Sequence, residues 1–230
     1  EMQRSLVGSE MCIETGLYVG EKVPTLEEVL TFLQGNSLRL NIEIKTCSAW
    51  YDKELTRRTV SLVQQSGIKD RVIFSSFEHR SLLDAKELDD TIPCGLLYVG
   101  NLIHPGRYAK AVGVEYIHPC WDNLDRQGVE DCRENGIEIH PWTINDPTSR
   151  DAMLAFECEH LITNYPDIYI VKRKKNRPHG WAVLFWGKTF KLPGKPRKKK
   201  KDSSFKEILY LWTLLSVSYT HLRAHETTLH

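Results

Sequence analysis

The sequence predicts an α/β fold built on a parallel β-sheet. Short apolar or alternating runs typical of strands alternate with amphipathic helical segments, at a spacing of roughly 20 to 30 residues. Such alternation is typical of right-handed βαβ units. The chain has no GxGxxG and no P-loop pattern, which disfavours a nucleotide-binding doubly wound sheet. Six predicted strands are too few for a closed barrel of eight, so these observations leave two architectures: an open sheet, or a barrel that has lost two strands.

The first predicted elements carry the clearest local signals. A helix over Thr25–Leu33 begins with a capping box, because Thr25 is followed three residues later by Glu28. A strand over Leu38–Lys45 follows, and then an amphipathic helix over Asp52–Ser66 that a glycine ends. The later predicted strands are Val72–Phe77, Cys94–Val99, Glu115–His118, Ile137–Ile144 and His160–Thr163. The later predicted helices are His79–Leu88, Pro105–Val112, Arg126–Asn135 and Pro147–Glu157.

Charge divides the chain into an acidic body and a basic tail. The whole sequence of 230 residues has a net charge of +1 and 41% hydrophobic residues, an ordinary globular composition that excludes disordered and disulfide-dense classes. Between Lys172 and Lys201 there are 13 Lys or Arg and no Asp or Glu, whereas residues 1–171 carry a net charge of −11. A shift of this size predicts that the folded domain ends near Val171 and that residues 172–215 form a basic tail or linker.

The basic tail has two interpretations. The run Lys172–Lys201 is either a solvated segment or a contact for an anionic membrane, and we expect no specific nucleic-acid partner. The apolar stretch Ile208–Leu215 is either the stub of a membrane span or an amphipathic surface helix. The six cysteines form no CxxC pair, which favours a reducing compartment. We therefore expect a cytoplasmic protein, with membrane association as the alternative.

One strand carries a candidate site. In Asn41–Lys45 (NIEIK), Glu43 and Lys45 are two residues apart and share one face, while Ile42 and Ile44 face the helical layer. A carboxylate at the rim of a barrel can bind a divalent cation, and an ammonium group can bind a phosphate oxygen. An internal ion pair at the end of the strand explains the same pattern equally well.

A second candidate follows a later strand. In His140–Asp146 (HPWTIND), Trp142 and Asn145 would line a ligand pocket if they lie at a barrel rim, or else belong to the core and a helix cap. The histidines His79, His104 and His118 lie at element ends without partner spacing, and we interpret them as structural.

Taken in order, these segments resemble the glycerophosphodiester phosphodiesterase family. The resemblance extends over roughly residues 6–169 and rests on the segments Gly20–Leu30, Leu40–Lys45, Val72–Leu82, Gly136–Asp146 and Leu161–Asp167. It implies a (β/α)8 TIM barrel that hydrolyses small glycerophosphodiesters to an alcohol and glycerol 3-phosphate with Mg²⁺ or Ca²⁺. By the match of motifs, Glu43 resembles a metal carboxylate, Lys45 a phosphate contact and Trp142 a wall of the substrate pocket.

The sequence also departs from the family pattern. The family's His-Arg-Gly and His-Asp motifs are not found, and the only Glu-x-Asp, Glu87–Asp89, falls at a helix end after the NIEIK strand. We therefore expect an incomplete barrel of about six of eight βα units, without the catalytic histidines and without activity of its own. The alternative is a non-catalytic module that binds an anionic membrane or nucleic acid through its tail.

The last residues resemble translated adapter DNA. Val217–Thr227 (VSYTHLRAHET) matches the translation of a DNA sequence that looks like a transposon-end sequencing adapter. We therefore interpret residues 216–230 as adapter-derived, and we expect no ligand role for the histidines they contain.

Overall fold

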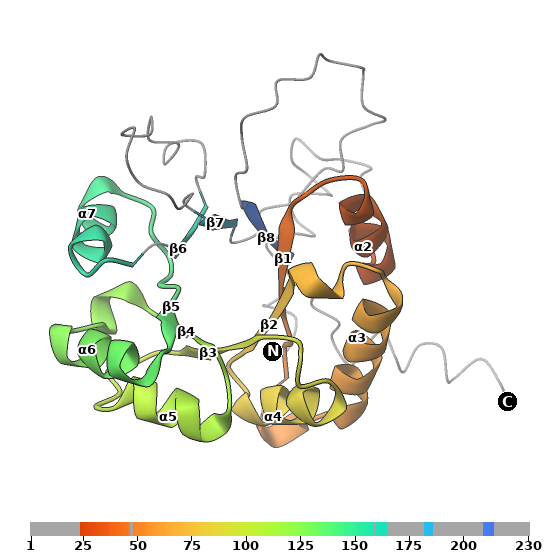
Figure 1. Cartoon of the computed structure of the whole chain (residues 1–230), viewed down its shortest axis with the longest axis horizontal. Coiled ribbons are helices and arrows are strands. Elements are labelled where there is room, and N and C mark those ends of the chain that lie inside the picture. Colours follow the sequence, from red (N-terminus) through yellow and green to blue (C-terminus); the bar gives the residue numbers. More distant parts are fainter. Residues whose placement is uncertain (1–23, 47, 159, 165–181, 186–208, 214–230) are drawn as a thin grey trace, which may run out of the picture.

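The computed structural model describes residues 24–46, 48–158, 160–164, 182–185 and 209–213 (Figure 1). The segment interpreted as adapter-derived lies outside these residues. The helices are α2 (Leu26–Gln34), α3 (Lys53–Gln65), α4 (His79–Leu88), α5 (Pro105–Val112), α6 (Arg126–Asn135) and α7 (Pro147–Ala155), with 3₁₀ turns at Ser48–Trp50, Lys69–Arg71 and Trp121–Asn123. The strands are β1 (Arg39–Glu43), β2 (Val72–Ser76), β3 (Cys94–Tyr98), β4 (Tyr116–Pro119), β5 (Glu138–Ile139), β6 (His160–Thr163), β7 (Ala182–Phe185) and β8 (Leu209–Thr213).

The strands form one parallel sheet that curls into a barrel with the helices outside it (Figure 1). The order β5-β4-β3-β2-β1-β8-β7-β6 makes β5 and β6 its two edges. Backbone hydrogen bonds join these edges: the Ile162 N–H donates to the Pro141 carbonyl at 3.0 Å, and the Ile144 N–H donates to the Ile162 carbonyl at 2.8 Å. The barrel architecture expected from the sequence is therefore confirmed.

Two strands come from the segment expected to be a tail. β7 and β8 lie between β6 and β1, with β8 paired to β1 and β7 paired to β6. Within the described ranges no helix accompanies either strand, so the helical layer covers the other six. Strand β8 stands where a membrane-span stub or a surface helix was expected, and its sequence LYLWT is rich in strand-forming aromatic residues. None of the helices described is long and apolar enough to cross a membrane.

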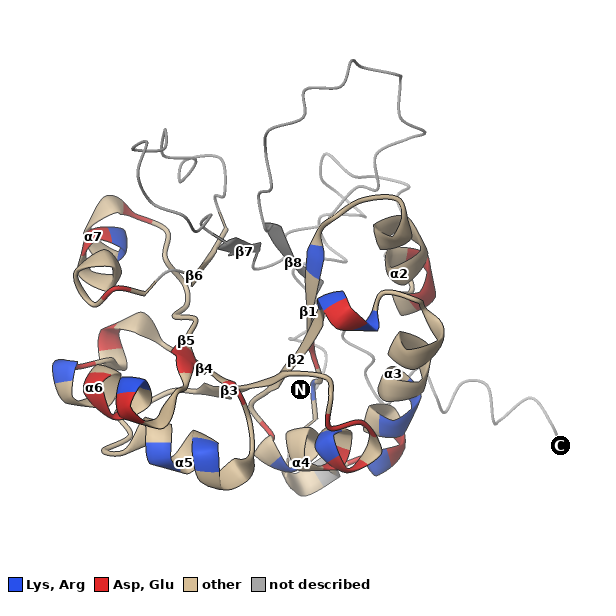
Figure 2. Cartoon of the chain, viewed as in Figure 1, with Lys and Arg blue, Asp and Glu red and all other residues tan. Residues whose placement is uncertain are grey.

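The strands place apolar side chains toward the helices, and several polar side chains toward the barrel interior. Leu40 and Ile42 of β1 and Phe74 of β2 belong to the apolar core between the barrel and the helices. The intervening residues, among them Asn41 and Glu43, are also buried but point to the barrel interior. Figure 2 shows the charged residues mainly on the helices. The barrel interior thus receives the polar side chains from which a site can be built.

Local signals placed most element boundaries correctly. The capping box is present, with the Glu28 carboxylate accepting from the Thr25 N–H at 2.8 Å and the Thr25 hydroxyl accepting from the Glu28 N–H at 3.3 Å. The strand expected over Ile137–Ile144 is shorter, at Glu138–Ile139. Extended pairing nevertheless continues, because the Trp142 N–H donates to the Pro119 carbonyl at 3.0 Å. Prolines have no N–H donor, so the ladder is interrupted where Pro119 and Pro141 occur.

Candidate functional site

The first candidate site lies where β1 ends, at the C-terminal rim of the barrel. Glu43 is the last residue of β1, and its side chain is 4% exposed. The Lys45 ammonium, at 31% exposure, lies 3.7 Å from Oε2 of Glu43. Burial raises the pKa of Glu43, and the charge of Lys45 opposes that rise. The two side chains share one face as expected, and Glu43 Oε2 accepts no hydrogen bond from the described residues.

Neighbouring loops brace this rim. The Ser76 hydroxyl donates to the Ile44 carbonyl at 2.7 Å, which ties the end of β2 to the end of β1. Glu78 follows β2 and accepts from the Ser48 hydroxyl at 2.6 Å and from the Arg80 guanidinium at 3.0 Å. Those bonds lower the pKa of Glu78, so it stays charged. The carboxylate of Glu78 therefore serves the loop structure and is already occupied.

Trp142 lies at the same end of the barrel, beyond β5. Its indole N–H donates to the His118 carbonyl at 2.7 Å, and its ring packs edge-on against Phe77, with centroids 5.8 Å apart. Phe77 follows β2 and is 43% exposed, so this aromatic pair lies at the boundary with solvent. Such a pair can form an apolar wall beside a polar site.

The polar residues after Trp142 serve the backbone. Asn145 Oδ1 accepts from the Asn164 N–H at 2.9 Å, which links the loops after β5 and β6. Asp146 caps α7 by accepting from the Thr148 N–H at 2.8 Å and the Ser149 N–H at 3.0 Å. The helix-cap alternative therefore describes Asp146 well, and Asn145 has a structural partner.

The described residues do not complete a divalent-cation site at this rim. Glu43 offers one buried oxygen without a hydrogen bond, which suits one ligand position. A hard cation takes six or more oxygens, and the one group of potential metal ligands in the described part of the chain lies elsewhere. Glu87–Asp89 does not supply the set, since Asp89 is bound by the Lys69 ammonium at 2.9 Å.

The histidines interpreted as structural have protein partners. His79 follows the end of β2, and its ring nitrogens lie 2.9 Å from the Leu97 carbonyl and 2.8 Å from the Tyr108 hydroxyl. His104 lies 3.7 Å from the Asp131 carboxylate at the start of α5. Both ring nitrogens of His79 have protein partners, and His104 has one acidic neighbour.

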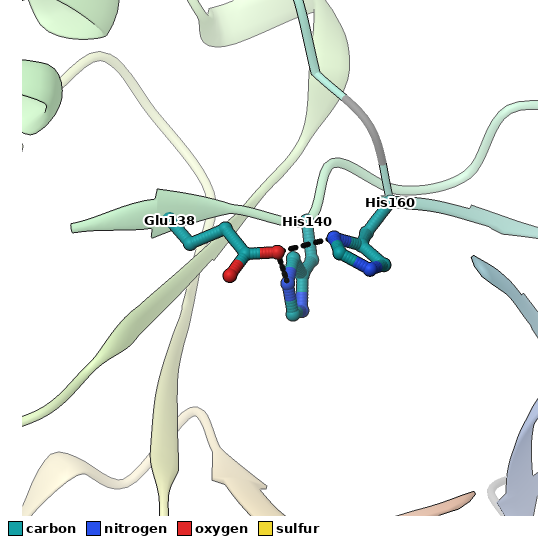
Figure 3. Close-up of side chains that lie close together, drawn as sticks. All are labelled: Glu138, His140 and His160. Atoms are coloured by element: carbon teal, nitrogen blue, oxygen red, sulfur yellow. Dashed lines mark hydrogen bonds and ion pairs between the residues drawn. The ribbon is translucent and has the colours of Figure 1, made fainter. Parts of the chain in front are cut away.

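A second polar cluster lies inside the barrel, toward the end where the strands begin (Figure 3). Glu138 is the first residue of β5 and His160 the first residue of β6, and their side chains meet that of His140. The His140 Nε2–H donates to Glu138 Oε1 at 3.1 Å, and His160 Nδ1 forms an ion pair with the same oxygen. Burial alone would raise the pKa of Glu138, but these bonds outweigh it and lower that pKa.

His118 extends the cluster into the barrel. Its Nε2 lies 3.1 Å from His140 Nδ1, and the two rings stack with centroids 4.9 Å apart. Gly95 of β3 makes room for it, because a Cβ there would lie 2.5 Å from His118 Nε2. Burial lowers the pKa of His140 to about 4 and the pKa of His118 well below its usual value. Both imidazoles are therefore neutral at pH 7.

This cluster was not predicted from the sequence. His118 was expected to be structural and without partner spacing, although residues 118, 138 and 140 lie near one another once β4 and β5 are paired in register. The available signal was the alternation within each strand: Glu138 and His140 are two apart and share a face, as Glu43 and Lys45 do. That signal becomes useful only when the order and stagger of the strands are known.

Comparison with known proteins assigns the family. The profile of the Glycerophosphoryl diester phosphodiesterase family matches residues 6–168. A glycerophosphodiester phosphodiesterase of Caldanaerobacter subterraneus subsp. tengcongensis is 31% identical over 153 residues, which cover 66% of this chain and 63% of the relative. One of Bacillus altitudinis is 28% identical over 173 residues, 73% of this chain and 68% of the relative. The chain thus spans about two thirds or less of the length of such relatives.

Solved structures support the same fold. A glycerophosphodiester phosphodiesterase of Parabacteroides distasonis superposes with a TM-score of 0.59 at 24% identity, covering 65% of this chain and 63% of that protein. An Oleispira antarctica phosphodiesterase in complex with the product sn-glycerol-3-phosphate superposes with a TM-score of 0.57 at 24% identity, covering 62% and 58%. At these identities the likeness establishes the barrel fold alone.

Proposed function

The chain belongs to the glycerophosphoryl diester phosphodiesterase family, and on that premise we propose that its C-terminal rim binds the phosphate of a glycerophosphodiester. The family reaction hydrolyses such a diester to an alcohol and glycerol 3-phosphate. The observation that carries the proposal is the Glu43–Lys45 pair, which lies where the active sites of TIM barrels are found. Lys45 is the proposed phosphate contact, Trp142 the proposed pocket wall and Glu43 one proposed ligand of Mg²⁺ or Ca²⁺.

The chemistry of the pair suits this role. Lys45 is partly exposed and lies at the long distance of 3.7 Å from Glu43, so its ammonium can turn toward an incoming phosphate oxygen. Glu43 is buried, and its Oε2 has a long ion pair with Lys45 but no hydrogen bond, so a cation could bind this atom when Lys45 turns toward a phosphate. A bound divalent cation would supply positive charge to offset that of the phosphate.

We further propose that this polypeptide binds a glycerophosphate without hydrolysing the diester. The sequence contains neither the His-Arg-Gly nor the His-Asp motif of the family. At the rim, both ring nitrogens of His79 are engaged by other groups. Proton transfer to the leaving alcohol needs a positioned acid, and the described residues offer none beside Lys45.

Binding of sn-glycerol 3-phosphate tests the proposed phosphate contact. The ligand is chosen because the Oleispira antarctica relative is described in complex with it. Lys45→Met should weaken binding about tenfold, because a hydrogen bond to a charged group contributes about 1.5 kcal/mol or more. Lys110→Met is the matched control, since Lys110 is an exposed lysine of α5. Isothermal titration calorimetry giving equal affinity for Lys45→Met and wild type would contradict the contact.

A turnover assay tests the second part. The chain is incubated with glycerophosphocholine and either Mg²⁺ or Ca²⁺, and release of glycerol 3-phosphate is measured. We expect no release above the protein-free blank. Metal-dependent release that Lys45→Met abolishes would overturn the proposed lack of hydrolysis and leave the proposed phosphate contact intact.

A second role is proposed for the basic segment Lys172–Lys201 in a cytoplasmic protein. Its 13 positive and zero negative charges favour contact with an anionic membrane. Only β7 of this segment lies within the described residues. We expect the chain to co-sediment with phosphatidylserine vesicles and not with phosphatidylcholine vesicles. Added salt should weaken this binding. Equal sedimentation with both kinds of vesicle would contradict it.

A further inference from the structure

The cluster at the other end of the barrel has a metal-ligand arrangement that the proposed function does not use. One oxygen of Glu138 and one nitrogen each of His140 and His160 lie within 4.8 Å of one another. Both imidazole nitrogens are directed at the same carboxylate oxygen, Glu138 Oε1 (Figure 3). The three ligand atoms are therefore close enough for one cation to replace the contacts they make with one another.

The donor types select the class of cation. Two imidazole nitrogens and one carboxylate oxygen form a donor set typical of zinc, with a fourth position open to water. Magnesium and calcium prefer sites made of oxygen alone. On a tetrahedral zinc ion with bonds of about 2.0 to 2.2 Å, two ligand atoms lie about 3.3 Å apart. The 3.1 Å between His140 Nε2 and Glu138 Oε1 is close to that separation.

A second layer of contacts holds the buried ligand in place. His140 is only 1% exposed, and its Nδ1 faces His118 Nε2 at 3.1 Å. When Nε2 of His140 binds a metal, Nδ1 carries the ring proton, and this Nδ1–H donates a hydrogen bond to Nε2 of His118. Metal-bound histidines characteristically make such an outer hydrogen bond, which fixes the ring orientation. Glu138 is 46% exposed, so an ion has a route of entry from solvent.

The position in the fold indicates what the ion would do. Glu138 and His140 belong to β5 and the residues just after it, while His160 belongs to β6. These are the two edge strands of the sheet, and the backbone hydrogen bonds described between them both involve Ile162. An ion held by all three side chains would connect the edges across the seam. The C-terminal rim carries chemistry in TIM barrels, whereas the opposite end contributes stability.

From this arrangement we propose that Glu138, His140 and His160 bind one zinc-type divalent transition-metal ion that clamps the seam between β5 and β6. The proposed site contains charges of both signs. Glu138 contributes one negative charge, and the positive charge of Arg39, the first residue of β1, interacts with His140. The clamp does not depend on the proposed phosphate contact, because it uses none of the residues at the opposite rim.

Zinc titration of the full 230-residue chain, made without a polyhistidine tag and stripped of metal, tests the clamp. We expect one zinc ion per chain, and a rise in melting temperature of about 5 to 10 °C at a hundredfold excess over the Kd. Glu138→Gln and His160→Gln should each weaken binding at least tenfold and remove most of the thermal shift. Zinc-edge X-ray absorption should report imidazole and oxygen ligands without sulfur.

Two control variants separate the clamp from other zinc ligands. His104→Gln alters an exposed histidine outside the cluster, and a variant with His221, His225 and His230 all changed to Gln alters the C-terminal histidines. Both should bind zinc as wild type does. Failure of the chain to bind one zinc ion, equal affinity in Glu138→Gln, or sulfur ligation would each overturn the clamp. Glu138 is half-exposed, so Glu138→Gln decides the matter even if His160→Gln does not fold.

Discussion

Each end of the barrel carries a pair of polar residues that are two apart in sequence, but the two pairs have different chemistry. At the C-terminal rim, Glu43 and Lys45 form a partly exposed ion pair suited to a charged ligand. Toward the opposite end, Glu138 and His140 form a partly buried hydrogen bond, and His140 in turn contacts the buried His118. In both cases one polar residue belongs to a strand, and the second lies two residues later, just beyond the end of that strand. The end of the strand at which the pair lies therefore distinguishes the proposed ligand site from the proposed metal clamp.

The largest effect should come from filling the space beside His118. Gly95→Val would place a Cβ 2.5 Å from His118 Nε2 in a buried layer. We expect the free energy of unfolding to fall by about 3 kcal/mol, since overpacked interiors strain side chains and backbone. Urea denaturation followed by circular dichroism measures this. Gly35→Ala is the control, because its Cβ would lie 3.7 Å from the Phe32 carbonyl in ordinary contact. Equal losses in the two variants would contradict close packing around His118.

A smaller effect should follow at the rim from Trp142→Phe. The change removes the hydrogen bond to the His118 carbonyl and keeps an aromatic ring beside Phe77. We expect a loss of about 1 to 2 kcal/mol in unfolding free energy and a weakening of glycerol 3-phosphate binding of about threefold or less. Denaturation and calorimetry on one preparation give both values. Unchanged stability would show that the hydrogen bond from the Trp142 indole to the His118 carbonyl does not stabilise the fold.

The smallest effect concerns Asp89, near the start of β3. Hydrogen bonds from Thr91 and the Lys69 ammonium lower its pKa in the folded chain. A group with a lowered folded pKa stabilises above its unfolded pKa, and that contribution disappears as the pH falls below about 4. Asp89→Asn should therefore cost about 1 kcal/mol at pH 7 and less at pH 3. Unfolding measured at both pH values checks the sign, and an equal cost at both would contradict it.

Local sequence signals predicted most of the fold. The capping box at Thr25 is present, and Gly113 and Gly136 end α5 and α6 with φ of 82° and 71°, a left-handed conformation that suits glycine. Strands β7 and β8 were not predicted. The apolar run of β7 lies within the basic segment Lys172–Lys201, and the run of β8 follows that segment, so composition indicated a tail.

The contact between Glu43 and Lys45 was predicted from the sequence, whereas the contacts of the histidine cluster were not. Glu43 and Lys45 lie within one strand, so spacing alone predicted that they share a face. The contact of His118 with His140, and of Glu138 with His160, joins residues far apart in sequence. Such contacts depend on the register between strands, which no local pattern supplies.

The most direct test of two ends with separate roles is the affinity for sn-glycerol 3-phosphate of wild type, Lys45→Met and Glu138→Gln, measured by titration calorimetry under one set of conditions. The two substitutions lie at opposite ends of the barrel. We predict that Lys45→Met weakens binding about tenfold and that Glu138→Gln leaves it unchanged. Equal affinity in all three proteins, or a loss confined to Glu138→Gln, would contradict the account.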